Sequence, residues 1–317
     1  MMKLSNICSL LFCCFMSLTA DAQVTGVSCC DWMMLKRQKL GEFQLSKDIK
    51  ADGVEMDMGS LGKRVYFDSR FRLYPAPYDS TETVKPLIYN KVEIEKFRGT
   101  ADSLGVRVSS IAMSGFFAQN FLKRPNYRTL VLDCLNTMAY FGCRVAFLPL
   151  GGSGHDWETE GSEAYNMLVE RLAAVGEMAA QRDMVIGIRT GMPAAFGKRL
   201  VDKANNIYKK RSNGKCGIAI YYNLQDACDN GWDICKELTL LGSQRVCQIH
   251  CSNTDSVTLR NDPEIDLPKI LGTLKKIGYK GWLTVERSRN AKDVKNVRGN
   301  YGDNVAYIKE TIKEYDK

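Results

Sequence analysis

Apolar residues recur along the chain with two alternating spacings, one typical of helices and one typical of buried strands. Between residues 271 and 277, leucines and an isoleucine keep the spacing of one helix face, and Gly278 stands where helices commonly end. The run Trp282-Leu-Thr-Val follows as a short buried strand, and Glu286 comes immediately after it. The pattern predicts a helix, a turn and a strand that finishes in a carboxylate.

The same alternation continues over nearly the whole chain. Strands are predicted at residues 24–30, 53–57, 106–112, 144–148, 184–188, 217–222, 245–249 and 282–285. Helices are predicted at residues 43–49, 88–104, 127–141, 163–182, 194–208, 224–241, 267–277 and 304–315. Regular alternation indicates a parallel sheet, and eight such units favour a closed barrel over an open doubly wound sheet. We therefore expect an α/β fold, a single (β/α)8 TIM barrel, over residues 23–317.

The composition agrees with one globular domain and argues against nucleic-acid binding. The chain has 317 residues, of which 45% are hydrophobic and 25% charged, ordinary values for a folded domain. The net charge of +8 comes from dispersed lysines and arginines, and we find no DNA- or RNA-binding motif. The sequence does not predict an oligomeric state.

Residues 1–22 read as a signal peptide rather than as part of the barrel. Lys3 precedes an apolar run at residues 7–18, and Ala20-Asp-Ala22 places small residues where a signal peptidase cleaves. We expect cleavage before Gln23 and an exported protein, periplasmic or secreted. The run is short for a membrane span, and no later stretch resembles one, so no membrane association is expected after cleavage.

Nine cysteines remain beyond residue 22, an odd number without any CxxC pair. This pattern gives no support to a zinc ribbon or a thioredoxin-type site. We expect most of them to be single buried thiols, because free cysteine is among the most buried residue types.

One long segment, residues 63–88, interrupts the alternation. It combines aromatic residues, among them Tyr66, Phe67 and Tyr74, with prolines and scattered charges. Long loops of this kind often serve a binding site. The aromatic residues can stack on a ligand or pack over the barrel rim, and the sequence leaves both readings open.

In a barrel of this type, reactive groups stand just past the carboxyl ends of the strands. The residues at these positions are unusually polar: Cys30, Trp32, Glu55, Asp57, Ser114, His155, Arg189, Asn223, Asp226, His250, Asn253 and Glu286. His250 and Glu286 follow neighbouring strands, so the pair is able to bind a metal or to exchange a proton.

Four segments, taken in order and with their spacing, resemble the xylose isomerase-like TIM-barrel family of sugar phosphate isomerases and epimerases. They are Ala180-Gln-Arg-Asp-Met-Val-Ile-Gly-Ile-Arg189, Gly217-Ile-Ala-Ile-Tyr-Tyr-Asn-Leu-Gln-Asp-Ala227, Gln248-Ile-His-Cys-Ser-Asn253 and Ile277-Gly-Tyr-Lys-Gly-Trp-Leu-Thr-Val-Glu286. The resemblance covers nearly all of residues 23–317, and its last segment is the most specific.

The resemblance implies a divalent metal held after strands five to eight by a glutamate, an aspartate, a histidine or other ligand, and a glutamate. Here Glu286 and His250 match the last two positions, whereas Arg189 and Asn223 replace the first two. A guanidinium repels a dication and cannot lose its proton to become a ligand. We therefore expect no cofactor of the family type, with Arg189 replacing the cation and pairing with Glu286. A shifted Mn²⁺, Mg²⁺ or Zn²⁺ on His250 and Glu286, with Asp226 or Glu55, remains the alternative.

The resemblance further implies a small sugar or keto-sugar derivative as substrate and a proton transfer next to a carbonyl. Glu286 is the expected base, Arg189 the electrophile, and His155 or His250 the second acid/base group. The residues expected to contact the sugar are Trp32, Glu55, Asn223, Asp226 and Asn253. Isomerisation, epimerisation and elimination share this first step, and the sequence does not separate them.

Two other functions were weighed against this one. A non-catalytic sugar-binding relative explains the two missing metal ligands equally well. A DNA-repair endonuclease on the same barrel needs many histidines and carboxylates for its metal cluster, and the chain has only two histidines.

Overall fold

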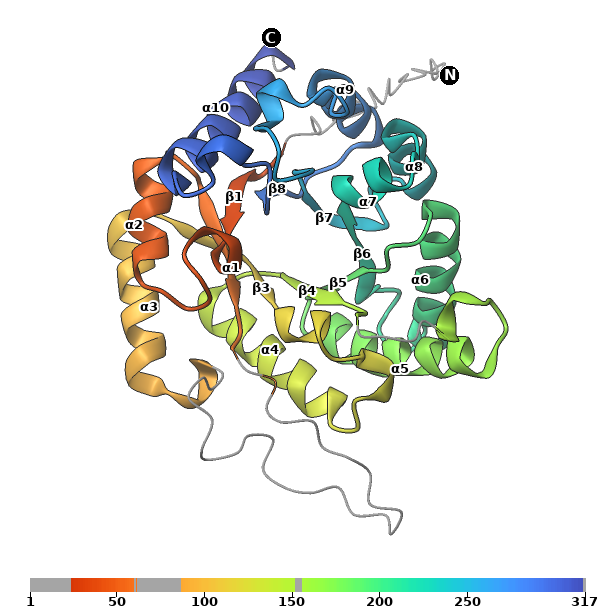
Figure 1. Cartoon of the computed structure of the whole chain (residues 1–317). Helices are drawn as coiled ribbons and strands as arrows, with labels where there is room; N and C mark the ends of the chain where they lie inside the picture. The colour runs from red at the N-terminus through yellow and green to blue at the C-terminus, as the bar shows by residue number, and fades with distance from the viewer. Residues whose placement is uncertain (1–23, 60, 62–86, 152–155, 316–317) are drawn as a thin grey trace, which may run out of the picture.

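The computed structural model describes residues 24–59, 61, 87–151 and 156–315, and these form a closed barrel of eight parallel strands in the order β1 to β8 (Figure 1). The prediction of a single (β/α)8 barrel is confirmed. The predicted signal peptide, nearly all of the aromatic segment 63–88, and His155 lie outside the described residues.

The elements lie close to their predicted positions. The strands are β1 Gly26–Cys30, β2 Gly53–Asp57, β3 Arg107–Ala112, β4 Val145–Pro149, β5 Val185–Arg189, β6 Ile218–Asn223, β7 Val246–His250 and β8 Trp282–Val285. The main helices are α1 Asp31–Met34, α2 Gly41–Asp48, α3 Lys91–Leu104, α4 Tyr127–Phe141, α5 Glu163–Ala180, α6 Ala194–Tyr208, α7 Leu224–Asp229, α8 Ile234–Leu241, α9 Leu267–Ile277 and α10 Val297–Tyr315. Short 3-10 turns connect several of them.

Two predicted helices differ from the structure, and one helix was not predicted. Two of these differences concern residues at the barrel mouth. The helix predicted at 224–241 is two helices, α7 and α8, because Gly231 turns the chain with a φ of 68°. A short unpredicted helix, α1, follows β1 at once and brings Trp32 to the barrel mouth. The last helix begins at Val297 rather than at residue 304.

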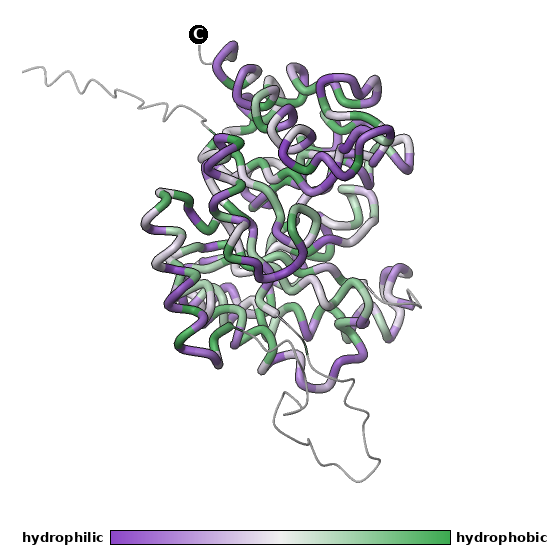
Figure 2. Tube along the Cα trace, turned by 60° about the vertical axis from the view of Figure 1, so that its left-hand side comes forward, coloured by the Kyte–Doolittle hydropathy of each residue, from purple (hydrophilic) through white to green (hydrophobic). Residues whose placement is uncertain are grey.

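The main apolar core fills the layer between strands and helices, and hydrophilic and hydrophobic residues accordingly alternate along the outer helices (Figure 2). The barrel interior is different. Its apolar part is a small separate cluster of Ala112, Phe147 and Tyr221, and the rest is polar, as described below. Within the described residues, no helix is both long and apolar enough to cross a membrane.

The start of β6 packs so closely on α5 that a side chain has no room at Gly217. A Cβ atom there would lie 2.0 Å from the carbonyl oxygen of Gly176, and backbone cannot yield as a flexible side chain does. We expect Gly217→Ala to lower the free energy of unfolding by about 1–3 kcal/mol. Gly99 in α3 is the matched control, because no atom lies within 4 Å of its Cβ position. Gly99→Ala should raise the free energy of unfolding by about 0.5–1 kcal/mol. Urea unfolding measures both, and equal values would contradict the tight α5–β6 contact.

Candidate active site

A cavity of about 590 Å³ opens at the carboxyl ends of the strands. Its charged lining residues come from three parts of the chain: Arg189 ends β5, Asp226 lies in α7, and Glu286 and Arg287 follow β8. Aromatic side chains form much of the remaining wall, namely Trp32, Phe117 and Trp157. A few charged groups among apolar and aromatic walls are typical of a small-molecule site.

Three side chains converge on one oxygen of Glu286. Its Oε2 lies 3.3 Å from Nδ2 of Asn223, 3.4 Å from Nδ1 of His250 and 3.7 Å from Nη1 of Arg189. Burial raises the pKa of Glu286. The charge that His250 carries when protonated, the positive charges of Arg189 and Arg287 and a hydrogen bond from Trp32 outweigh burial and leave the pKa below the usual 4.5. Glu286 is therefore ionised at neutral pH, although its side chain is only 4% exposed.

Arg189 has a closer partner than Glu286. Its Nε and Nη2 donate to the two carboxylate oxygens of Asp226 at 3.0 and 2.6 Å, a bidentate pair. Burial alone lowers the pKa of Arg189, but Asp226 and Glu286 raise it above its usual value. The expected pairing with Glu286 exists as the longer contact, and the guanidinium lies between two carboxylates.

His250 lies beneath Glu286, fully buried among aromatic rings. Its ring centroid is 4.5 Å from that of Tyr221 and 4.7 Å from that of Phe147. Nε2 lies 2.7 Å from the carboxylate of Glu55, so this nitrogen carries a proton and donates it to Glu55. That assignment leaves Nδ1, which has no hydrogen-bond partner, facing Glu286 at 3.4 Å.

Glu55 also belongs to a network of buried polar side chains in the barrel interior, which we call the polar belt. Its members are Glu55, Ser110, Tyr221, Gln248 and Thr284. The second oxygen of Glu55 accepts hydrogen bonds from Tyr221 at 2.6 Å and from Ser110 at 2.7 Å. Nε2 of Gln248 lies within hydrogen-bonding distance of both of these hydroxyls and of the hydroxyl of Thr284, at 2.8 to 2.9 Å. Two of these contacts, Tyr221 with Glu55 and Gln248 with Ser110, join strands that are not neighbours in the sheet, so the belt runs through the interior.

Sequence reasoning missed the belt, although a signal for it was present. Gln248 and Thr284 are polar residues in the middle of apolar strands, and Tyr221 and Ser110 face them across the barrel. Polar residues at central strand positions are informative because a buried polar group needs a partner.

The structure brings most of the predicted site residues together. Trp32, Arg189, Asp226 and Glu286 line the cavity, and Asn223 and His250 contact Glu286 from behind. Three of the five expected sugar contacts do not line the described cavity. They are Asn223, which contacts Glu286, Glu55, whose oxygens are taken up by His250, Tyr221 and Ser110, and Asn253.

Asn253 instead fixes the loop after β7. Its Nδ2 donates to Asp262 at 3.0 Å and to Glu264 at 2.8 Å, and its backbone N–H donates to the hydroxyl of Ser288. In the sequence, an asparagine directly after a strand resembles a ligand-binding group. Only the structure shows that its amide nitrogen already donates to two carboxylates.

The four positions after β5 to β8 carry a guanidinium, an amide, an imidazole and a carboxylate. Over the ranges that the structure describes, no group of three or more histidine, cysteine, aspartate and glutamate side chains is placed to hold a metal ion. Nη1 of Arg189 and Nδ2 of Asn223 face Oε2 of Glu286 at 3.7 and 3.3 Å, so both present nitrogen donors to this carboxylate. All nine cysteines of the described residues are free, and five of them are buried.

Comparison with known proteins identifies the family to which this chain belongs. A model of the xylose isomerase-like TIM barrel matches residues 43–311. A comparison with curated proteins found no significant match. A xylose isomerase domain protein from Planctomyces limnophilus superposes with a TM-score of 0.64 at 15% identity, over 92% of this chain and 98% of that one.

Two epimerases also share the fold. A 3-keto-D-glucoside 4-epimerase from E. coli has a TM-score of 0.63 at 15% identity, over 91% of this chain and 100% of its own. A D-psicose 3-epimerase from Clostridium cellulolyticum H10, solved with D-tagatose, has a TM-score of 0.64 at 11% identity, over 90% and 99%. The chain belongs to the xylose isomerase-like TIM barrel family.

Proposed function

We propose that the protein transfers a proton next to the carbonyl group of a sugar or keto-sugar derivative, with Glu286 as the base. The observation that carries the proposal is the pair of Glu286 in the cavity wall and His250 Nδ1 at 3.4 Å behind it. The named activities of the two epimerases of similar fold support the substrate class.

In this proposal Glu286 removes the proton from the carbon beside the carbonyl group. Negative charge then develops on the carbonyl oxygen, and a donor at that oxygen stabilises the resulting enediolate. Arg189 is the cation in the cavity wall beside Glu286 and takes this role. Asp226 holds the guanidinium in place through both of its oxygens.

In this proposal His250 accepts the proton that Glu286 has removed from the sugar. Nδ1 accepts it from Glu286, and the imidazolium that forms is stabilised by the Glu55 carboxylate at Nε2. Because the side chain of His250 is fully buried, it acts through Glu286 rather than on the sugar. Glu55 is therefore a positioning residue for His250.

A single base in the described cavity wall favours isomerisation or elimination over epimerisation. Epimerisation that removes a proton from one face and returns one to the other needs a second acid opposite the base. Arg189 stands at the end of β5, where the resemblance places a glutamate, and Asp226 is held by Arg189. Glu286 is then left to remove the proton and to return it to a neighbouring carbon on the same face.

We further propose that the family metal is not part of this mechanism. A divalent cation between the ends of β5 and β8 would meet the positive charge of Arg189, 3.7 Å from Glu286. Arg189 and Asn223 stand in place of two of the four family ligands, and both present N–H donors to Glu286. These residues do not fit a dication, and the guanidinium supplies the positive charge in its place.

A sugar-binding protein without turnover is the second candidate. Its support is the lowered pKa of Glu286, because the groups that stabilise the carboxylate, among them Arg189 and Asn223, weaken it as a base toward a C–H bond. The aromatic walls and the charged groups of the cavity would serve binding alone equally well.

Proton exchange in heavy water separates the two candidates. We expect the protein to replace a C–H proton beside the carbonyl of D-fructose, D-tagatose or a 3-keto-D-glucoside with deuterium, as followed by NMR. Glu286 must be ionised to act, and its pKa is below 4.5. The rate should therefore be flat down to about pH 5 and fall at lower pH. Binding of these sugars without exchange would favour the second candidate.

A further inference from the structure

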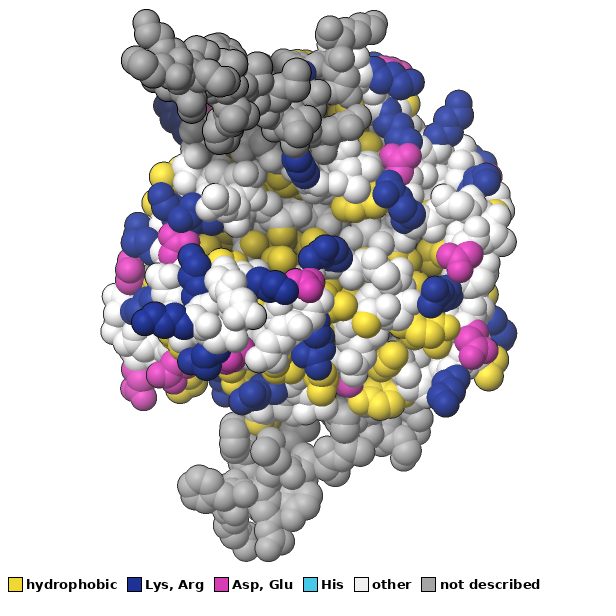
Figure 3. All heavy atoms as spheres, turned by 180° about the vertical axis from the view of Figure 1, so that it is seen from behind, with side chains coloured by type: hydrophobic (Ala, Val, Ile, Leu, Met, Phe, Trp, Pro, Cys, Tyr) yellow, Lys and Arg dark blue, Asp and Glu magenta, His cyan; other side chains and the backbone are white. Residues whose placement is uncertain are grey.

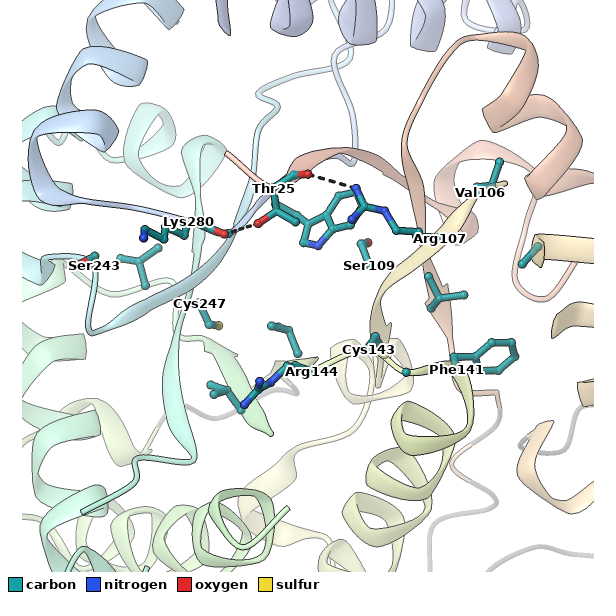
Figure 4. Close-up of a pocket in the computed structure, with 18 of the residues that line it drawn as sticks. Thr25, Val106, Arg107, Ser109, Phe141, Cys143, Arg144, Ser243, Cys247 and Lys280 are labelled. Carbon is teal, nitrogen blue, oxygen red and sulfur yellow. Dashed lines mark hydrogen bonds between the residues drawn. The ribbon is translucent and has the colours of Figure 1, made fainter. Parts of the chain in front are cut away.

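A second, larger hollow of about 940 Å³ lies at the opposite end of the barrel, where the strands begin. Figure 4 shows it between the starts of β1, β3, β4 and β8, with Arg107 and Lys280 on one side and Arg144 on the other. The face of the molecule seen in Figure 3 has hydrophobic side chains at the floor of a hollow and lysine and arginine side chains around it.

The floor of the hollow is formed by side chains near the strand starts. Ser109, Val145, Val185 and Cys247 line it there. Trp282 lines it as well, with Arg107 stacked on its ring. Val145 and Cys247 pack against the small interior cluster above them and close the floor.

The rim carries an excess of positive charge. Arg98, Arg107, Arg144 and Lys280 line the hollow, against a single carboxylate, Asp102. Asp102 lies 3.7 Å from Arg98, so one of the four cations has a carboxylate partner there. The rim therefore favours an anion.

Two of the arginines are held in place but keep most of their donors. Arg107 stacks on the indole of Trp282, 4.3 Å from the ring centroid, and donates one bond from Nη2 to the carbonyl of Thr25. Arg144 donates one bond from Nε to the carbonyl of Asp183. A guanidinium has five N–H donors, so each retains several toward the hollow.

We propose that this hollow is a second binding site, for an amphipathic organic anion with an apolar body and a carboxylate, sulfate or phosphate head. The valines and Cys247 of the floor receive the apolar body. Arg107 and Arg144 bind the head with charge-assisted hydrogen bonds. The site is separate from the cavity of Glu286 and does not depend on the proposed function.

Calorimetric titration with two probes of equal chain length tests the site on the full-length protein. Dodecanoate, below its micelle concentration, should bind, and dodecyltrimethylammonium, with the same apolar chain and the opposite charge, should not. The double variant Arg107→Gln/Arg144→Gln should bind dodecanoate at least about tenfold more weakly, since it loses the charged donors.

A matched double variant controls for surface charge and folding. Arg199 and Arg211 lie on the outer surface and pair with Glu160 and Glu177, so Arg199→Gln/Arg211→Gln should leave dodecanoate binding unchanged. Binding that is absent in the unaltered protein, or equal for both probes, overturns the proposal. So does binding that persists in Arg107→Gln/Arg144→Gln but weakens in Arg287→Gln, because Arg287 lines the other cavity.

Discussion

Replacing Glu286 with glutamine is expected to lower the rate of proton exchange by about 10³-fold while changing the dissociation constant of the sugar by less than about threefold. Glutamine keeps the shape of the side chain and an oxygen that accepts from Asn223, but it cannot accept a proton from carbon. NMR exchange rates and calorimetric binding, measured on the same preparation with the same sugar, give the two quantities.

Glu160 offers the control for this substitution. It is a glutamate on the outer surface, paired with Arg199 at 2.7 Å, so Glu160→Gln changes the net charge equally and should leave the exchange rate unaltered. A Glu286→Gln variant that exchanges protons at the original rate would show that another group is the base. Loss of sugar binding together with exchange would instead point to a structural role for Glu286.

Placing the two family-type ligands at the ends of β5 and β6 is expected to raise the affinity for a divalent metal far above that of the unaltered protein. In the double variant Arg189→Glu/Asn223→Asp, four donors of the family type would stand after β5 to β8, because His250 and Glu286 are already present. Mn²⁺ should bind this variant more than about 100-fold tighter than the unaltered protein, since losing even a group that only orients a ligand costs about 10–100-fold. Calorimetry and elemental analysis after dialysis measure the difference.

The variant needs a control for repulsion among its carboxylates. Without metal, the new side chains stand near Asp226 and Glu286 and should lower the melting temperature, and Mn²⁺ should raise it again. Arg189→Gln/Asn223→Asp lacks one ligand and should gain much less from Mn²⁺. Stoichiometric Mn²⁺ in the unaltered protein would contradict the role we assign to Arg189.

The barrel and the meeting of its key residues were predictable because both depend on short-range patterns. Alternating spacings fix the order of strands and helices, and order alone places Arg189, Asn223, His250 and Glu286 at neighbouring strand ends. The structure brings the first three of these residues within hydrogen-bonding or ion-pair range of Glu286.

The depth of a side chain in the barrel was not predictable in the same way. Glu55 was expected at the barrel mouth with Glu286, but it is the middle residue of β2 and lies under His250 with both oxygens occupied. Asp226 is paired with Arg189, because α7 begins directly at the end of β6. The sequence suggested one longer helix there. The hollow at the strand starts depends on side-chain volumes summed over separate strands, which no local pattern contains.

The polar belt in the barrel interior divides the molecule into two compartments. Ser109, in the floor of the lower hollow, donates to Ser28, which is hydrogen-bonded to Thr284. Thr284 in turn contacts the hydroxyl of Tyr221, the donor to Glu55 beneath His250. All of these side chains are buried, so the belt is a septum that no sugar or amphiphile crosses. A chain of hydrogen-bonding side chains therefore joins the floor of the lower hollow to Glu55 beneath His250.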